Sequence, residues 1–192
     1  FWREFYNYIL FHFPKSEFEN LNEINVNWSQ NEEHFQKWCE GKTGVPLIDA
    51  AMRYFNLTGT MHNRLRMIVS SYLTKNLLID WKKGERYFAS KLLDYEASSN
   101  IGSWQWAAST GADAVPYFRI FNPYLQSAKF DKDAIFIKSV IPELKDVNSK
   151  LIHSENGVQS NIFLNYPPQL VSIEFSRKRA IEEFKRANNE KY

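Results

Sequence analysis

The segment from Asp94 to Trp106 offers more reactive and ligand-binding side chains than the rest of the sequence. It holds two carboxylates, two amides, a glycine and two indoles within thirteen residues. Carboxylates and amides hydrogen-bond the edge of a cofactor ring, and tryptophan stacks on flat rings. Because a surface loop rarely contains two tryptophans, we expect this segment to line a binding site.

A second polar group has helical spacing, so its members lie together beside an apolar stripe: Asn63, Arg66, Met67 and Ser70. A buried carboxylate needs a cation as its partner. Arg66 is the candidate partner for Asp94, because it belongs to the adjacent basic helix. We therefore expect the two polar groups to form one site.

Charge and aromatic content suggest what such a site could bind. Residues 61–92 carry seven basic and two acidic side chains, although the whole chain has a net charge of only +2. Basic residues beside Trp2, Trp104 and Trp106 fit phosphate contacts combined with base stacking, the two components of nucleic-acid binding. A solvated helix face is the simpler interpretation of the charge, and core packing that of the tryptophans.

The elements that would position these residues are helical. Pattern and punctuation predict helices over residues 1–13, 31–40, 46–59, 60–77, 80–92, 130–140 and 175–187. The expected N-caps of three of them are Thr60, Asp80 and Ser176. Irregular structure is expected over residues 16–31, 94–123 and 149–172. With no Val/Ile run typical of parallel strands, the sequence predicts an all-α domain.

Composition excludes several classes of protein. A chain of 192 residues with 44% apolar and 24% charged residues is long enough for one domain with a core, and is not a disordered tail. Its single cysteine, Cys39, excludes an internal disulfide and suits a reducing, cytoplasmic compartment. No His, Cys, Asp or Glu cluster has metal-ligand spacing, and no apolar run approaches the ~20 residues of a membrane span. We expect no metal and no membrane.

Several uncommon sequence words occur in the order in which they occur in the DNA photolyase/cryptochrome family. They are Glu40–Gly44, Asp49–Arg53, Thr58–Met67, Leu78–Trp81, Asn100–Ala107 and Tyr117–Pro123. They span most of residues 2–144, and beyond them only the closing helix is similar. The chain thus resembles the C-terminal, all-helical FAD-binding domain of that family, over residues 1–192. The first residue, Phe1, enters a helix directly, so we expect an N-terminally incomplete piece of a longer protein.

The resemblance implies a light-driven activity with FAD as the cofactor. In this family reduced flavin, excited by blue light, donates an electron to a thymine dimer and regains it after the ring splits. Trp106 and the eight residues after it are similar to the class that repairs cyclobutane pyrimidine dimers. The implied enzyme is a deoxyribodipyrimidine photolyase, and photolyases are among the proteins known to flip their target out of the duplex.

The resemblance also implies roles for single residues around the flavin. Asp94 would hydrogen-bond the ring edge and pair with Arg66, and Asn100 would face the flavin N5 atom. Further cofactor contacts are implied for Asn63, Tyr95 and Glu96, the last in a position where the family usually has Asp. The tryptophans that match the family's electron relay are Trp104, Trp81 and Trp28.

For the substrate, Trp2 and Trp106 are implied as an aromatic clamp on the flipped dimer. The remaining residues of the implied DNA-binding surface are Arg3, Tyr6, Asn63, Arg64, Leu65, Arg66, Met67 and Arg119. For Arg119 an internal ion pair is an equal alternative. The expected partner is damaged DNA, bound by a monomer.

The parts of the family's machinery that lie upstream of this chain are the loop for the FAD phosphates and an antenna domain with a folate or deazaflavin. We therefore expect the isolated chain to be inactive and the longer protein to be the enzyme. Two other functions stay open. One is a cryptochrome-type photoreceptor that signals through protein partners, and the other is a flavin-free helical DNA-binding module.

Overall fold

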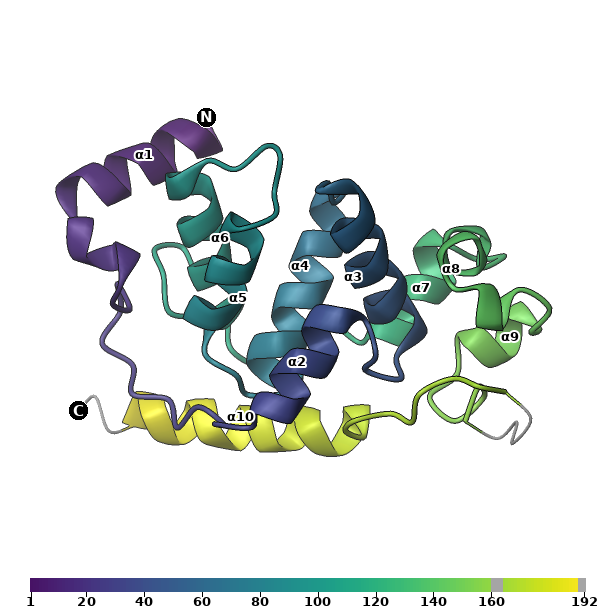
Figure 1. Cartoon of the computed structure of the whole chain (residues 1–192). Helices are drawn as coiled ribbons and strands as arrows, with labels where there is room; N and C mark the ends of the chain where they lie inside the picture. Colours follow the sequence, from purple (N-terminus) through teal and green to yellow (C-terminus); the bar gives the residue numbers. More distant parts are fainter. Residues whose placement is uncertain (160–163, 190–192) are drawn as a thin grey trace.

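The structure, a computed structural model, describes residues 1–159 and 164–189, and within them it contains helices and no strand (Figure 1). The α-helices are α1 (Trp2–His12), α2 (Glu32–Glu40), α3 (Pro46–Thr58), α4 (Asn63–Ser71), α5 (Trp81–Ala89), α6 (Ala97–Ala108), α7 (Pro123–Phe130), α8 (Ile135–Val140), α9 (Ser149–Ile152) and α10 (Ile173–Asn189). A π-helix, η2 (Tyr72–Asn76), continues α4, and two 3₁₀ turns are η1 (Pro14–Glu17) and η3 (Pro142–Leu144). The predicted all-α class is confirmed.

Helices α2 and α3 begin and end where local sequence signals predict. The side chain of Asn31 caps α2 by accepting a hydrogen bond from the backbone N–H of His34. Pro46 occupies the first turn of α3, where its missing N–H costs nothing. Gly41 and Gly59 end the two helices in the left-handed conformation that glycine adopts without strain.

Helix α6 corrects the expectation of irregular structure over residues 94–123. It begins after Glu96, whose side chain accepts hydrogen bonds from the backbone N–H groups of Ser98 and Ser99. Its sequence is rich in Ser, Gly and Asn and has no clear apolar stripe, because it packs on α1, α4 and α5 on several sides. Tertiary packing therefore outweighs its weak helical pattern.

Other predicted boundaries are also wrong in detail. His62, not Thr60, caps α4, because its Nδ1 atom accepts a hydrogen bond from the backbone N–H of Arg64. Ser176 lies inside α10, where its hydroxyl donates to the carbonyl oxygen of Ile173 and accepts from Asn76. Of the helix expected over 130–140, only α8 (Ile135–Val140) is present, and the preceding helix α7 (Pro123–Phe130) was not predicted.

The π-helix η2 joins the middle of the fold to α10, which runs along the base of the molecule (Figure 1). Lys75 is fully buried there, and its Nζ atom donates to the carbonyl oxygen of Ala108 at 3.1 Å and to Ser109 Oγ at 2.8 Å. Its third direction faces the Phe184 ring, 3.3 Å from the centroid. Burial lowers the pKa of Lys75, but two acceptors and a ring face suit the protonated amine. Lys75 thus ties the end of α6 to α10.

Candidate functional site

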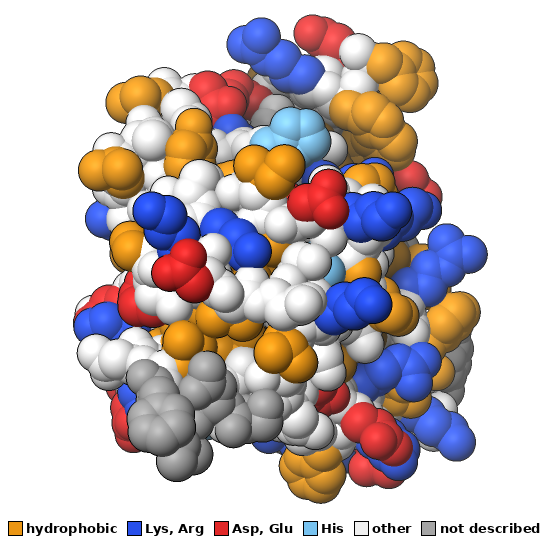
Figure 2. Space-filling view, turned by 90° about the vertical axis from the view of Figure 1, so that its right-hand side faces the viewer, with side chains coloured by type: hydrophobic (Ala, Val, Ile, Leu, Met, Phe, Trp, Pro, Cys, Tyr) orange, Lys and Arg blue, Asp and Glu red, His pale blue; other side chains and the backbone are white. Residues whose placement is uncertain are grey.

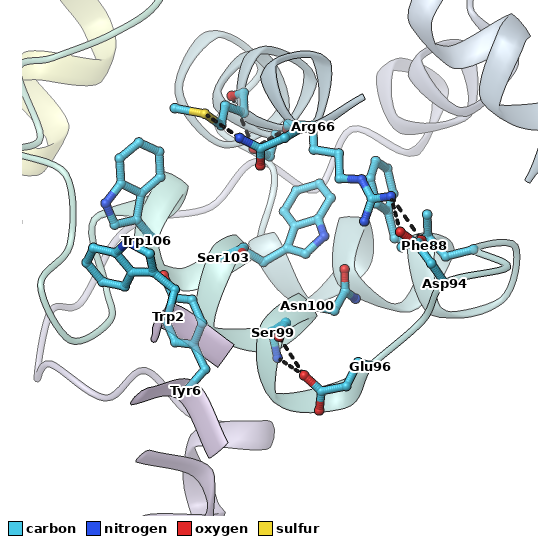
Figure 3. Close-up of a pocket in the computed structure, with 15 residues that line it drawn as sticks. Trp2, Tyr6, Arg66, Phe88, Asp94, Glu96, Ser99, Asn100, Ser103 and Trp106 are labelled. Carbon is cyan, nitrogen blue, oxygen red and sulfur yellow. Dashed lines mark hydrogen bonds and ion pairs between the residues drawn. The ribbon is translucent and has the colours of Figure 1, made fainter. Parts of the chain in front are cut away.

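A hollow lined by polar and aromatic side chains lies between α1, α4, α5 and α6 (Figure 3). Its volume is about 440 Å³. The residues that line it are Trp2, Tyr6, Asn63, Arg66, Met67, Ser70, Phe88, Leu92, Asp94, Glu96, Ser99, Asn100, Ser103, Trp104 and Trp106. The two polar groups singled out in the sequence therefore meet in one cavity.

Ten of the predicted site residues line this cavity, and seven do not. The seven outside its lining are Arg3, Trp28, Arg64, Leu65, Trp81, Tyr95 and Arg119. Trp28 and Trp81 were expected behind the site, as members of a relay, so their absence from the lining does not contradict that role. Tyr95 was expected as a cofactor contact, and its side chain is 40% exposed outside the cavity.

Arg66 and Asp94 form the ion pair expected from the sequence. Arg66 Nη2 lies 2.9 and 2.8 Å from the two carboxylate oxygens of Asp94. Arg66 Nε donates to the carbonyl oxygen of Met61 at 2.7 Å, and this fixes the guanidinium against the start of α4. The Asp94 side chain is 63% exposed, so the carboxylate is not buried as expected and still has room for a ligand.

Asn100 shows only one half of its amide to the cavity. Its Nδ2 atom donates to Glu85 Oε1 at 3.0 Å and to the Glu85 carbonyl oxygen at 3.3 Å. Its Oδ1 atom has no hydrogen-bond partner among the described residues and is not sealed from the cavity. The site therefore presents a hydrogen-bond acceptor at this point and selects a donor on the ligand.

Glu85, the group behind Asn100, was missed in the sequence. Burial raises its pKa above the ordinary value, although the hydrogen bond from Asn100 opposes this shift. A signal was present, because four buried residues of α5 recur at helical spacing: Trp81, Gly84, Glu85 and Phe88. A carboxylate on such a core-facing stripe indicates a buried partner.

Glu96 lines the cavity, but its carboxylate is already occupied. It accepts from the backbone N–H groups of Ser98 and Ser99, each at 3.0 Å, and from both of their hydroxyls. Burial raises the pKa of Glu96, but the hydrogen bonds from Ser99 and Ser98 outweigh it, so the pKa lies below its ordinary value. The side chain caps α6 and thereby positions Asn100, one turn further along.

Aromatic side chains form the wall opposite Arg66, where the stick view places Trp2, Tyr6 and Trp106 together (Figure 3). The ring centroids of Trp2 and Tyr6 are 6.1 Å apart. Tyr6 packs directly on Gly102 of α6, where any larger residue would displace the ring. Trp2 is 54% exposed, so it has an open face for a partner that α1 does not supply.

The remaining tryptophans lead away from the cavity. Trp104 lines it, and its ring packs on Gly84 and on Trp38, the latter at 6.1 Å between centroids. Trp81 is fully buried and its Nε1 atom donates to Asn20 Oδ1 at 2.8 Å. Trp28 is half-buried against Phe184, with ring centroids 6.0 Å apart. The three relay candidates therefore range from the cavity lining through the core to the surface.

Two negative findings hold for residues 1–159 and 164–189. No group of three or more His, Cys, Asp or Glu side chains is placed to hold a metal ion. No helix there is long and apolar enough to cross a membrane. Arg119, for which an ion pair was an alternative, is exposed and pairs with no carboxylate within the same residues.

The described residues form an all-helical fold with one hollow that combines an ion pair, an unpaired amide oxygen and tryptophan side chains. This combination is typical of a helical cofactor-binding domain. Comparison with known proteins makes this specific. The family model described as the FAD binding domain of DNA photolyase matches residues 1–186, so the chain belongs to that family. The resemblance stated from the sequence is confirmed.

Individual relatives agree with this assignment. The chain is 50% identical over 191 residues to the deoxyribodipyrimidine photo-lyase of Buchnera aphidicola from Acyrthosiphon pisum, covering 97% of this chain and 40% of that one. A bacterial class III photolyase from Agrobacterium tumefaciens matches with a TM-score of 0.90 and 41% identity, over 98% of this chain and 41% of that chain. A Synechocystis cryptochrome matches with a TM-score of 0.86 and 35% identity, over 95% and 40%. The chain spans about two fifths of the length of these proteins.

Proposed function

We propose that this chain is the flavin-binding and substrate-binding part of a light-driven lyase that repairs cyclobutane pyrimidine dimers in DNA. The observation that carries the proposal is the cavity itself. One wall offers polar groups fixed by hydrogen bonds, and the other offers exposed tryptophan faces. The polar wall suits the edge of a flavin ring, and the tryptophan wall suits the faces of the two joined pyrimidines.

The cavity fits FAD by the chemistry of its donor set. Asn100 Oδ1 is a free acceptor, and it would receive the N5–H group of a reduced flavin. An oxidised flavin has no proton at N5, so the same oxygen would meet a second acceptor there. Glu85 keeps the amide in this orientation because it engages Nδ2. We infer that the site favours the reduced cofactor.

Arg66 and Asp94 would hold the polar edge of the ring. The Asp94 carboxylate would accept a ring N–H, and the Arg66 guanidinium would offset negative charge on the reduced ring. Phe88 and Leu92 supply an apolar surface in the same cavity. When bound, reduced FAD supplies one electron on excitation by blue light and regains it after two carbon–carbon bonds of the dimer have broken.

The substrate would enter on the side of Trp2 and Trp106. A flipped pyrimidine dimer presents the faces of two pyrimidines joined by a cyclobutane ring, and packing on an aromatic side chain stabilises a base by about 1–3 kcal/mol. Asn63 and Met67 line the cavity from α4 and would contact the lesion edge. Arg3, Leu65 and Arg119 lie outside the lining, so we assign them at most to contacts with the flanking DNA.

We further propose that Trp104, Trp81 and Trp28 relay an electron from the surface to the cavity and so restore the reduced cofactor. Their positions support this order, because only Trp104 lines the cavity, Trp81 is fully buried and Trp28 is the most exposed of the three. Indole rings suit such a relay since each is oxidised by one electron at a time.

The test uses the complete protein loaded with FAD. Binding is measured by gel shift on a duplex with one thymine dimer and on the same duplex without it, before and after blue light. Repair of the dimer with release of the intact duplex is the expected result. Equal binding to both duplexes and no repair would instead favour a cryptochrome-type photoreceptor, the candidate supported by the likeness to the Synechocystis cryptochrome.

A further inference from the structure

Two arginines of α4, two residues apart, are held in opposite ways. Arg66 is paired with Asp94, as described above. Arg64 has no carboxylate partner within residues 1–159 and 164–189. Its guanidinium carbon instead lies 4.1 Å from the centroid of the Phe130 ring, at the end of α7.

Phe130 serves as a platform for two cations. Lys129 Nζ lies 5.3 Å from the same ring centroid and also has no ion pair in this part of the chain. The next residue, Asp131, has its carboxylate engaged by the backbone N–H groups of Phe136 and Ile137 at the start of α8. The nearest acidic residue in the sequence thus accepts backbone hydrogen bonds and forms no ion pair with either cation within the described residues.

Phe130 is 51% exposed, so about half of its surface is open to solvent. Figure 2 shows several Lys and Arg side chains along one edge of the face that carries α7, α8 and α9, with apolar side chains and a few Asp and Glu side chains between them. An exposed ring under a cation is the arrangement that orients a guanidinium without cancelling its charge.

We propose that Phe130 is a positioning residue that holds Arg64 beside the cavity as a free cation for a DNA phosphate. Arg64 directly follows Asn63, which lines the cavity, and its guanidinium is directed toward Phe130, on the neighbouring side of α4. A duplex carries one charge per about 1.7 Å of its axis, so any duplex that delivers a nucleotide there brings phosphates past this position. A carboxylate in place of Phe130 would compete with phosphate, whereas a ring does not. This inference rests on the proposed DNA binding.

The test is a double-mutant cycle in the complete protein that carries Lys129→Gln, so that only Arg64 remains on the ring. Phe130→Leu, Arg64→Gln and the pair are compared for binding to the dimer-containing and undamaged duplexes at several salt concentrations. An exposed cation–π contact corresponds to about a two- to five-fold change in affinity. We expect Phe130→Leu to weaken binding by that factor with Arg64 present and to have no effect in Arg64→Gln.

The salt dependence separates orientation from charge. Arg64→Gln should reduce the slope of log K against log salt by about 0.9, the value for one phosphate. Phe130→Leu should leave that slope unchanged, because the charge is still there, and Phe130→Tyr should restore the full affinity. Circular dichroism and melting temperature confirm that each variant folds. Lys150→Gln on α9 is the matched control for loss of a surface charge, and no change is expected from it.

An equal loss from Phe130→Leu in both backgrounds would overturn the platform, and so would full affinity in Phe130→Leu. An unchanged salt slope in Arg64→Gln would overturn it as well, because Arg64 would then contact no phosphate. Failure of the proposed function looks different. In that case the wild-type protein binds both duplexes equally, while the coupling between Phe130 and Arg64 is still measured on undamaged DNA.

Discussion

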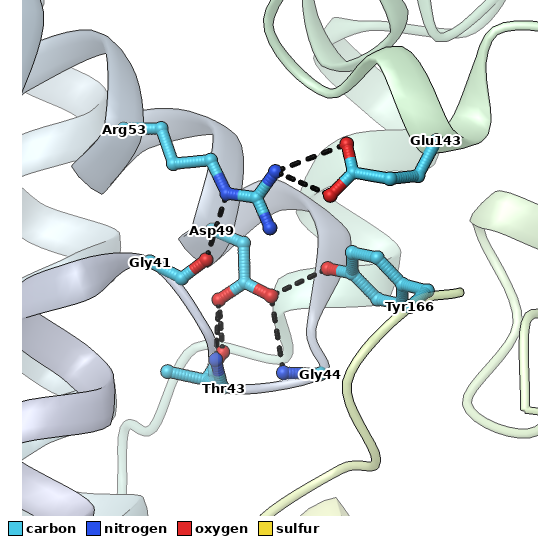
Figure 4. A network of polar contacts seen from close by, with 7 residues as sticks. All are labelled: Gly41, Thr43, Gly44, Asp49, Arg53, Glu143 and Tyr166. Carbon is cyan, nitrogen blue, oxygen red and sulfur yellow. Dashed lines mark hydrogen bonds and ion pairs between the residues drawn. The ribbon is translucent and has the colours of Figure 1, made fainter.

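Two polar clusters of this protein contain the same kinds of groups and differ in what they leave unpaired. One is the cavity wall around Asn100 and Asp94, and the other surrounds Asp49 at the start of α3 (Figure 4). Asp49 accepts from Thr43 N and Oγ1 at 2.7 Å each, from Gly44 N at 3.0 Å and from the Tyr166 hydroxyl at 2.5 Å.

The Asp49 cluster is closed. Burial raises the pKa of Asp49, against the hydrogen bonds from Thr43 and Tyr166. Beside it Arg53 donates to the Gly41 carbonyl oxygen and to both oxygens of Glu143 (Figure 4). In the cavity, by contrast, Asn100 Oδ1 has no hydrogen-bond partner among the described residues, and the Asp94 carboxylate is largely exposed. Satisfied polar groups stabilise the fold, and unsatisfied ones at a cavity indicate a ligand.

The sharpest test of this contrast is Asp49→Ala. It leaves two backbone N–H groups and the Tyr166 hydroxyl buried without an acceptor, so we expect the free energy of unfolding to fall by about 3–5 kcal/mol. Urea unfolding followed by circular dichroism measures it. A loss below about 1 kcal/mol would mean that this cluster is not a structural one.

Trp106→Ala should affect the other region and not the fold. We expect binding of dimer-containing DNA to weaken by about 1–3 kcal/mol, because one stacking face is lost. Trp106 is only partly buried, so stability should change much less than in Asp49→Ala. Gel shifts and urea unfolding give both numbers. If the affinity for DNA is unchanged and the free energy of unfolding falls, Trp106 is a structural residue like Asp49.

Glu85 sharpens the comparison through pH. Burial raises its pKa in the folded state, so the native protein binds this proton more tightly than the unfolded chain. The associated stability is present below the ordinary pKa of glutamate and is lost as pH rises through the raised value. Glu85→Gln should flatten this part of the pH dependence of unfolding. If the wild type and the variant show the same pH dependence of unfolding, the Glu85 carboxyl group is exposed to water and not buried.

Asp94→Asn should have the smallest effect on stability. Its ion pair with Arg66 is largely exposed, and exposed pairs contribute about 0–1 kcal/mol. Binding of FAD to the complete protein, measured by flavin fluorescence, should nevertheless weaken measurably, because the carboxylate would hold the ring edge. A large loss of stability with unchanged FAD binding would reverse the assignment of Asp94.

Some of this could be predicted from sequence because the signals are local. Proline and glycine marked the ends of α2 and α3, and charge logic paired Arg66 with Asp94. The conversion of α4 into the π-helix η2 had no such signal, since its apolar stripe continues unbroken.

Contacts between residues far apart in the sequence could not be predicted, because the usable sequence signals are local. Tyr166 meets Asp49 across 117 positions of sequence, and Gly102 is required by a ring on α1. The residues next to them in the sequence give no signal of such a partner. The same holds for Asn100 and Glu85, where the fold alone decides which end of the amide faces the cavity.

Helix α6 is restrained at both of its ends by a charged side chain of the favourable sign. Glu96 sits at the positive end of the peptide dipoles, and Lys75 at the negative end. These two contacts restrain α6 against translation along its axis and against rotation about it. The same restraint acts on three site residues of this helix, Asn100, Trp104 and Trp106. The distances between them are therefore fixed before a ligand binds. Removal of either the Glu96 or the Lys75 contact should therefore increase the mobility of all three side chains together.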